Sequence, residues 1–173
     1  VSVKINIISA NQVSIEGKFK DESVSQTNWS FLQDYADVTN LGERIENLKL
    51  FDSKENEIEL RKLNAGEYLA NQKPLSFKYQ VKLHPSTKIT DSAHTSWLTE
   101  NNGILMMADL LPQFDSENIF VDFYLPNDFK IIHSIPLLEN INSSGFNLED
   151  AVILVGRNWR EKDLKFSGKT VRL

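Results

Sequence analysis

The three histidines are the residues of this sequence best suited to metal or acid–base chemistry. His84 precedes Pro85, His94 lies ten residues further along the chain, and His133 ends a run of β-type residues. A zinc hydrolase usually takes two histidines from one helix face, spaced i and i+4, because that spacing directs both side chains to one ion. The sequence has no such pair. We therefore predict no metal ligand in this chain and interpret each histidine as a locally hydrogen-bonded side chain.

Motifs for nucleophilic and phosphate chemistry are absent as well. The sequence contains no Cys, its seven Gly are isolated from one another, and no Gly-x-Ser-x-Gly motif occurs. A phosphate-binding loop and a nucleophile elbow both depend on such glycines, so both kinds of site are excluded. No carboxylate pair can be singled out among 24 Asp and Glu. We predict no catalytic residue, and a hydrolase whose Ser-His-Asp triad assembles from distant positions remains a third alternative.

Three tryptophans could bind a ligand through their ring faces. Trp29, Trp97 and Trp159 all lie near turn-like or irregular segments, where an aromatic ring can stack on a sugar or fill a groove between domains. We expect Trp29 and Trp159 to plug the ends of the hydrophobic core. For Trp97, which lies inside a long segment without clear periodicity, a core role and a contact role stay open.

Composition narrows the class of protein. The chain has 173 residues and a net charge of −5, with 40% hydrophobic and 25% charged residues. No apolar run approaches the roughly 18 residues that span a bilayer, so we expect no membrane span. Basic residues are scattered singly, which argues against a nucleic-acid partner. The sequence begins at Val1 rather than Met, and we expect a processed or clipped product of an extracytoplasmic bacterial protein.

A period of two dominates the chain and predicts β-strands. In residues 75–83 every odd position is apolar and every even position is polar, the pattern of a strand with one face on a core. Phe77, Tyr79 and Val81 should therefore be buried. Similar runs at residues 1–7 and 13–19 predict a hairpin. Further strands are expected at residues 45–51, 57–63, 67–70, 119–125, 129–133, 152–155, 164–166 and 171–173.

The predicted fold class is all-β. Many short strands separated by turn residues indicate an antiparallel β-sandwich or a saddle-like open sheet, with at most one or two short helical turns, the best candidate being residues 144–151. No repeat, low-complexity tract or charge run divides the chain, so we predict a single domain over residues 1–173.

Residues 85–113 form the longest segment without a clear period. A stretch of that length is usually a functional loop or a misread strand. It places Trp97 before Glu100, Asn101 and Asn102, and then continues at Gly103 into apolar residues 104–107. This order predicts a polar exposed tip and an apolar stem that re-enters the core.

Five segments carry a resemblance to a known family. Residues 43–52 (ERIENLKLFD), Thr95-Ser96 followed by Gly103, and residues 125–134 (LPNDFKIIHS) occur in this order, and residues 148–156 (LEDAVILVG) and 166–171 (FSGKTV) follow. Together they resemble the N-terminal β domain of glycyl-aminopeptidase-type (gluzincin) zinc metallopeptidases. The resemblance implies a non-catalytic accessory domain, with the catalytic zinc domain downstream of Leu173 and absent from this chain.

The resemblance also implies partners. The chain itself would bind no cofactor, zinc would belong to the parent protein's catalytic domain, and the partners would be that domain and a peptide substrate. Trp97, Glu100, Asn101 and Asn102 are then candidates for contact with the substrate or with the catalytic domain. Glu100 could pair with the free amine of a peptide, because a carboxylate binds an ammonium well in a partly dry cleft.

One alternative from another class of protein stays open. A stand-alone β-sandwich binding or adhesion module could bind a protein ligand, or stack a carbohydrate on Trp97 or Trp159. The reading frame beyond Leu173 distinguishes the two hypotheses, because it either continues into a His-Glu-x-x-His helix or stops.

Overall fold

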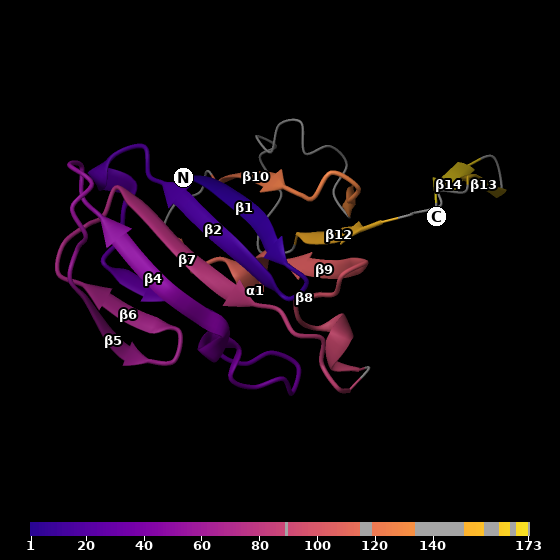
Figure 1. Ribbon diagram of the computed structural model, residues 1–173, viewed down its shortest axis with the longest axis horizontal. Helices are drawn as coiled ribbons and strands as arrows, with labels where there is room; N and C mark the ends of the chain where they lie inside the picture. The colour runs from indigo at the N-terminus through magenta and orange to yellow at the C-terminus, as the bar shows by residue number, and fades with distance from the viewer. Residues whose placement is uncertain (89, 115–118, 134–150, 158–162, 167–168, 173) are drawn as a thin grey trace.

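The structure is a computed structural model that describes residues 1–88, 90–114, 119–133, 151–157, 163–166 and 169–172 (Figure 1). In chain order its elements are β1 (Ser2–Ser9), β2 (Gln12–Lys18), η1 (Glu22–Val24), β3 (Asn28–Ser30), η2 (Leu41–Arg44), β4 (Ile45–Phe51), β5 (Leu60–Asn64), β6 (Glu67–Ala70), β7 (Ser76–Lys82), η3 (Asp91–Ala93), β8 (Trp97–Leu98), β9 (Asn102–Met106), α1 (Met107–Leu110), β10 (Phe120–Tyr124), β11 (Lys130–His133), β12 (Val152–Gly156), β13 (Asp163–Phe166) and β14 (Lys169–Arg172). None of the helices in this described part has the length and apolar character that a membrane crossing requires.

The largest sheet has five strands in the order β10-β1-β2-β7-β4. The predicted hairpin is confirmed, since β1 and β2 pair antiparallel with Ile5 opposite Ile15. Strand β7 then pairs antiparallel with β2 and with β4. One pair differs from the antiparallel expectation, because β10 lies parallel to β1, with Val3 opposite Val121. Parallel strands need a long crossover connection. Here all elements from β2 to α1 lie between β1 and β10 in the chain.

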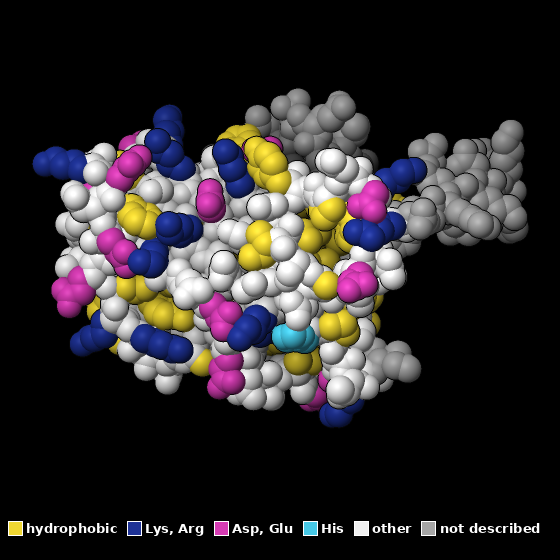
Figure 2. Space-filling model, in the orientation of Figure 1, with side chains coloured by type: hydrophobic (Ala, Val, Ile, Leu, Met, Phe, Trp, Pro, Cys, Tyr) yellow, Lys and Arg dark blue, Asp and Glu magenta, His cyan; other side chains and the backbone are white. Residues whose placement is uncertain are grey.

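The two faces of this sheet differ as a period of two requires. The inner face carries buried apolar side chains from four strands: Val3, Ile5, Val13, Ile15, Ile45, Leu50, Phe77, Tyr79 and Val81. The predicted burial of Phe77, Tyr79 and Val81 is thus confirmed. The outer face carries polar side chains such as Lys4, Glu16 and Lys82, which are exposed. Figure 2 shows charges of both signs interspersed over this face.

Two smaller sheets contribute the rest of the core. One has the order β3-β6-β5 and the other the order β11-β12-β9-β8, while β13 and β14 pair as a separate two-stranded sheet. Trp29, Phe31 and Tyr68 from the first sheet and its flank, and Leu105 and Ile153 from the second, belong to the same buried cluster as the inner face of the five-stranded sheet. The sheets are open in the described residues, so the predicted all-β class of sandwich or open sheet is confirmed.

Aromatic rings fill the centre of this cluster. We call the following set the aromatic core: Phe19, Trp29, Phe31, Phe77, Tyr79 and Phe114. The centroids of Trp29 and Phe77 are 4.9 Å apart in an edge-to-face contact, and those of Phe31 and Tyr79 are 5.1 Å apart. Such pairs contribute about 0.5 to 1.5 kcal/mol each beyond the area that they bury. The expected core role of Trp29 is confirmed, because the side chain is buried and its indole N–H donates to the Gln26 carbonyl.

Most predicted strands have the expected positions, and the exceptions are informative. Strand β5 begins at Leu60 rather than at residue 57. Glu57 makes only an isolated bridge to Phe51. The sequence does not predict strand β3. Residues 85–113 contain β8, β9 and α1, so the misread-strand alternative for this segment is correct. The four helical segments have three or four residues each. Of the predicted helical turn at residues 144–151, residues 144–150 lie outside the described residues.

Candidate functional site

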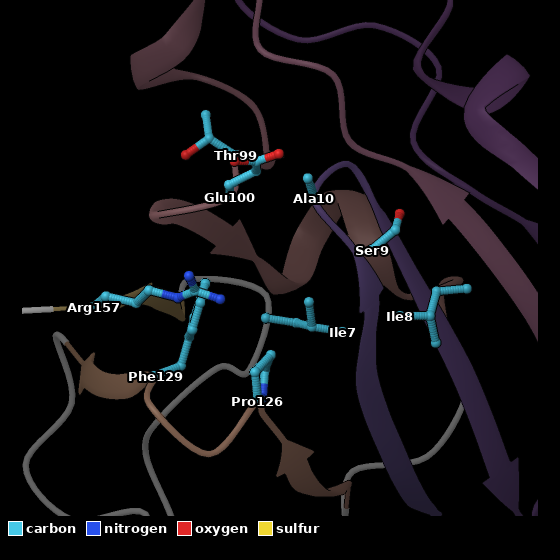
Figure 3. A pocket seen from close by; sticks show the side chains of 9 residues that line it. All are labelled: Ile7, Ile8, Ser9, Ala10, Thr99, Glu100, Pro126, Phe129 and Arg157. Atoms are coloured by element: carbon cyan, nitrogen blue, oxygen red, sulfur yellow. The ribbon is translucent and has the colours of Figure 1, made fainter.

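Four turns and strand ends meet at one end of the five-stranded sheet and enclose an open pocket. The turn between β1 and β2, the turn between β8 and β9, the connection from β10 to β11 and the end of β12 surround a volume of about 360 Å³. Its lining consists of Ile7, Ile8, Ser9, Ala10, Thr99, Glu100, Pro126, Phe129 and Arg157 (Figure 3). No pattern in the sequence predicts that these four segments lie close together.

Hydrogen bonds to a threonine fix the turn between β8 and β9. The Thr99 amide donates to the Asn102 carbonyl at 2.8 Å, and Thr99 Oγ1 accepts from the amides of Asn101 and Asn102 at 3.3 and 3.1 Å. A hydroxyl that bonds to backbone groups two and three residues ahead is a common way to close a tight turn. The same hydroxyl lies 2.9 Å from Asn102 Oδ1. The predicted polar tip is therefore a short closed turn.

The four predicted contact residues have different positions in this turn. Glu100 lines the pocket, whereas Asn101 and Asn102 are exposed. Asn101 contributes a backbone contact, since its carbonyl accepts from the Arg157 amide at 2.8 Å. Trp97 is half-buried, pairs with Ile104 across the strands, and donates its indole N–H to the Ser92 carbonyl at 2.9 Å. Contact of any of them with substrate or a second domain stays a prediction.

Glu100 is the acidic group of the pocket. Its carboxylate is exposed and makes no hydrogen bond or ion pair with any residue that the structure describes. The pocket around it is apolar on the side of Ile7, Pro126 and Phe129. Among the described residues, the pocket thus combines one carboxylate with an apolar wall.

Arg157 is the basic group of the pocket, and sequence reasoning missed it. Its Nε lies 2.8 Å from Asp128 Oδ2, and its guanidinium lies over the Phe129 ring at 5.1 Å from the centroid. Figure 3 shows Arg157 and Phe129 beside each other. The only sequence signal is Pro126, Asn127 and Asp128, residue types that favour a turn but do not indicate which strand end the turn meets.

A buried polar cluster lies at the start of β8, next to this turn. Asp109 in α1 accepts the Ser96 amide at 2.7 Å and the Ser96 hydroxyl, and forms an ion pair with Arg44 at 3.0 Å. Arg44 also donates to the Ser96 carbonyl at 3.2 Å. We call Arg44, Ser96 and Asp109 the polar junction. It fixes the start of β8, and thereby the base of the turn that carries Glu100.

His84 and His94 have different local partners. His84 Nδ1 lies 3.1 Å from the side-chain Nδ2 of Asn11, in agreement with the interpretation of a hydrogen-bonded histidine, and the His94 ring contacts Tyr35 edge-on with the ring centroids 6.0 Å apart. The side chain of His133 lies outside the described residues, as does Trp159. Within the part of the chain that is described, no three His, Asp or Glu side chains are grouped to hold a metal ion.

Comparison with known proteins identifies the fold. No family model and no curated protein matches the sequence. Among solved structures, the chain is similar to an aminopeptidase N family protein from Idiomarina loihiensis, with a TM-score of 0.68 and 12% identity over 99% of this chain and 31% of that chain. An M1 zinc metallopeptidase from Deinococcus radiodurans gives a TM-score of 0.46 at 8% identity, over 99% of this chain and 45% of that one, which is too low to indicate the same fold. The chain thus spans about a third of the first relative, and it has the fold of a part of an aminopeptidase N family protein.

Proposed function

We propose that this chain is the non-catalytic N-terminal domain of a zinc-dependent aminopeptidase-like metallopeptidase. One observation carries the proposal: nearly the whole chain matches one part of an aminopeptidase N family protein, with a TM-score of 0.68. The match covers 31% of that chain, which leaves room for a catalytic domain in a parent protein. The catalytic zinc belongs to that domain, since the described residues here contain no group that fits a metal ion.

The role of the domain is to pack on the catalytic domain and help to shape the substrate cleft. The turn between β8 and β9 is the surface suited to this role, because it is closed by Thr99 and presents Glu100, whose carboxylate has no partner among the described residues. Loops held on a rigid sheet commonly carry such contacts. Glu100 would receive the peptide's ammonium group, and Trp97 would contact the neighbouring domain.

The coding sequence gives the first test. The reading frame beyond Leu173 should continue into a helix with a His-Glu-x-x-His motif, and the sequence upstream of Val1 should encode the export signal of an extracytoplasmic bacterial protein. A natural stop close to Leu173 would contradict the proposal and favour the stand-alone binding module.

Zinc and peptide assays give the second test. The 173-residue chain incubated with zinc should neither hydrolyse peptides nor gain melting temperature, because only a metal that binds the native state stabilises it by mass action. In the full-length protein, Glu100→Gln should raise KM for peptides at an unchanged melting temperature, and Trp97→Ala should weaken docking of the two domains. Glu16→Gln, on the outer face of β2, is the matched control. Stoichiometric zinc binding by the isolated chain would contradict the proposal.

A further inference from the structure

The pocket next to Glu100 has the size of a ligand site. Its volume of about 360 Å³ lies within the range of roughly 300 to 1,000 Å³ that is usual for small-molecule sites. Side chains of Ile7, Pro126 and Phe129 give it an apolar wall, and Glu100 and Arg157 add charged groups. Such a mixture of an apolar surface and a few polar groups is the usual composition of a small-ligand site.

Two side chains contact the Arg157 guanidinium. The Asp128 carboxylate lies beside its Nε and the Phe129 ring lies under its plane. The two Nη groups make no hydrogen bond to a described residue, and the Arg157 side chain is 39% exposed. A planar guanidinium whose orientation is fixed binds a carboxylate through two parallel hydrogen bonds.

Glu100 and Arg157 line the same pocket but do not pair with each other. The ion pair of Arg157 is formed with Asp128, and Glu100 has no partner among the described residues. In Figure 3 the two side chains come from different strand ends, with Glu100 beside Thr99 and Arg157 beside Phe129. The pocket therefore presents one negative group, one positive group and an apolar wall to a single ligand.

We propose that this pocket binds an apolar zwitterion, namely a free amino acid or a short peptide with a large apolar side chain. The ligand's carboxylate binds the Nη groups of Arg157, its ammonium group binds Glu100, and its side chain packs on Ile7, Pro126 and Phe129. All of these residues belong to this chain. The inference shares Glu100 with the proposed function but needs no catalytic domain, so either of the two can fail alone.

The test is a titration of the 173-residue chain followed by amide NMR spectra. The probes are leucine, the dipeptide Leu-Leu, leucinamide, which lacks the carboxylate, and N-acetyl-leucine, which lacks the ammonium group. Leucine or Leu-Leu should cause saturable shifts at the residues of the pocket, and each blocked probe should bind about tenfold more weakly, as expected for the loss of one charged hydrogen bond. Stronger binding of leucine identifies a free amino acid as the ligand, and stronger binding of Leu-Leu identifies a peptide.

Two variants test which residue binds the carboxylate of the ligand and which binds its ammonium group. Arg157→Gln should weaken binding of the zwitterion about tenfold and leave leucinamide unaffected, whereas Glu100→Gln should weaken it similarly and leave N-acetyl-leucine unaffected. Arg61→Gln and Glu16→Gln remove exposed charges outside the pocket and should change nothing. Absence of saturable shifts with every probe, or equal losses in the control variants, would overturn the inference. Asp128→Asn keeps the guanidinium and should weaken binding less than Arg157→Gln does.

Discussion

The aromatic core and the polar junction hold the molecule together in different ways. In the aromatic core, rings from β2, β3 and β7 and their flanks pack at centroid distances near 5 to 6 Å with little directional constraint. In the polar junction, one carboxylate binds an amide, a hydroxyl and a guanidinium at defined distances. Apolar packing tolerates small adjustments, whereas the junction fails if one partner is lost. The first builds the sheet and the second positions the turn.

The largest expected loss of stability comes from a substitution beside the aromatic core. Val81→Asp should lower the free energy of unfolding by more than about 4 kcal/mol, because Val81 is fully buried and the new carboxylate has no partner. Chemical denaturation measures the change. Lys82→Ala, on the exposed side of the same strand, should alter stability by only about 0.5 kcal/mol despite the ion pair with Glu46. Similar losses for both variants would mean that β7 does not separate a buried from an exposed face.

The next effect lies in the polar junction. Asp109→Ala should lower the free energy of unfolding by about 3 kcal/mol, because it leaves Arg44 and the Ser96 amide without their partner. The Asp109 side chain is 2% exposed and the Arg44 side chain 17% exposed, so water replaces little of the lost interaction. Chemical denaturation of Asp109→Ala and of the double variant Arg44→Met/Asp109→Leu measures the two changes in the free energy of unfolding.

The double variant is the control for this prediction. Replacing both members of a buried ion pair by apolar residues removes the uncompensated charge, so Arg44→Met/Asp109→Leu should lose less stability than Asp109→Ala alone. A double variant that is as unstable as the single one would show that the carboxylate acts through the Ser96 amide and not through Arg44.

The two regions also differ in how much the sequence reveals. Strand β7 could be predicted because its nine-residue alternation is local, and the burial of Phe77 and Val81 followed from it. Strands β3 and β8 have three and two residues, too few to show a period. The ion pair between Arg44 and Asp109 joins residues 65 positions apart, and no local pattern carries that information.

The candidate site follows the same division. Glu100 could be selected from the sequence because it lies in a long aperiodic segment with polar residues, where functional groups are often found. Arg157 could not be selected, because its place in the pocket depends on β12 pairing with β9, which brings Gly156 opposite Asn102. Tertiary pairing, and not residue type, decides which charged groups share the pocket.

A smaller effect lies where the two regions meet. The Tyr79 hydroxyl donates to the Leu110 carbonyl at 2.8 Å and so connects the aromatic core to α1, next to Asp109. Tyr79→Phe should lower the free energy of unfolding at neutral pH by about 1 kcal/mol, because the buried carbonyl loses its donor while ring packing is kept. Denaturation at pH 7 measures this loss. A loss as large as that of Asp109→Ala would mean that the two regions are not separable.

Tyr79→Phe should also change how stability depends on pH. Burial raises the pKa of Tyr79 well above its usual value of 10.0. Below about pH 10 the phenol is protonated in both states, and above it the unfolded chain releases the proton first, so stability falls as pH rises. Tyr79→Phe should therefore lose less stability than the unmodified protein between about pH 9 and pH 11. Tyr68, whose pKa burial also raises, is present in both proteins and does not affect the difference.

The smallest effect lies in the turn that the polar junction supports. Thr99→Ala removes the hydroxyl that accepts the Asn101 and Asn102 amides, but solvent can replace it, so the free energy of unfolding should fall by less than about 1 kcal/mol. The change should instead be local. Hydrogen exchange at those two amides should become faster, while exchange in β7 stays unchanged, because the turn opens without disturbing the aromatic core. Thr87→Ala, an exposed threonine outside the turn, should alter neither. If exchange in β7 also accelerated, the turn and the core would open as one unit, and the separation between the region that builds the sheet and the region that positions Glu100 would be wrong.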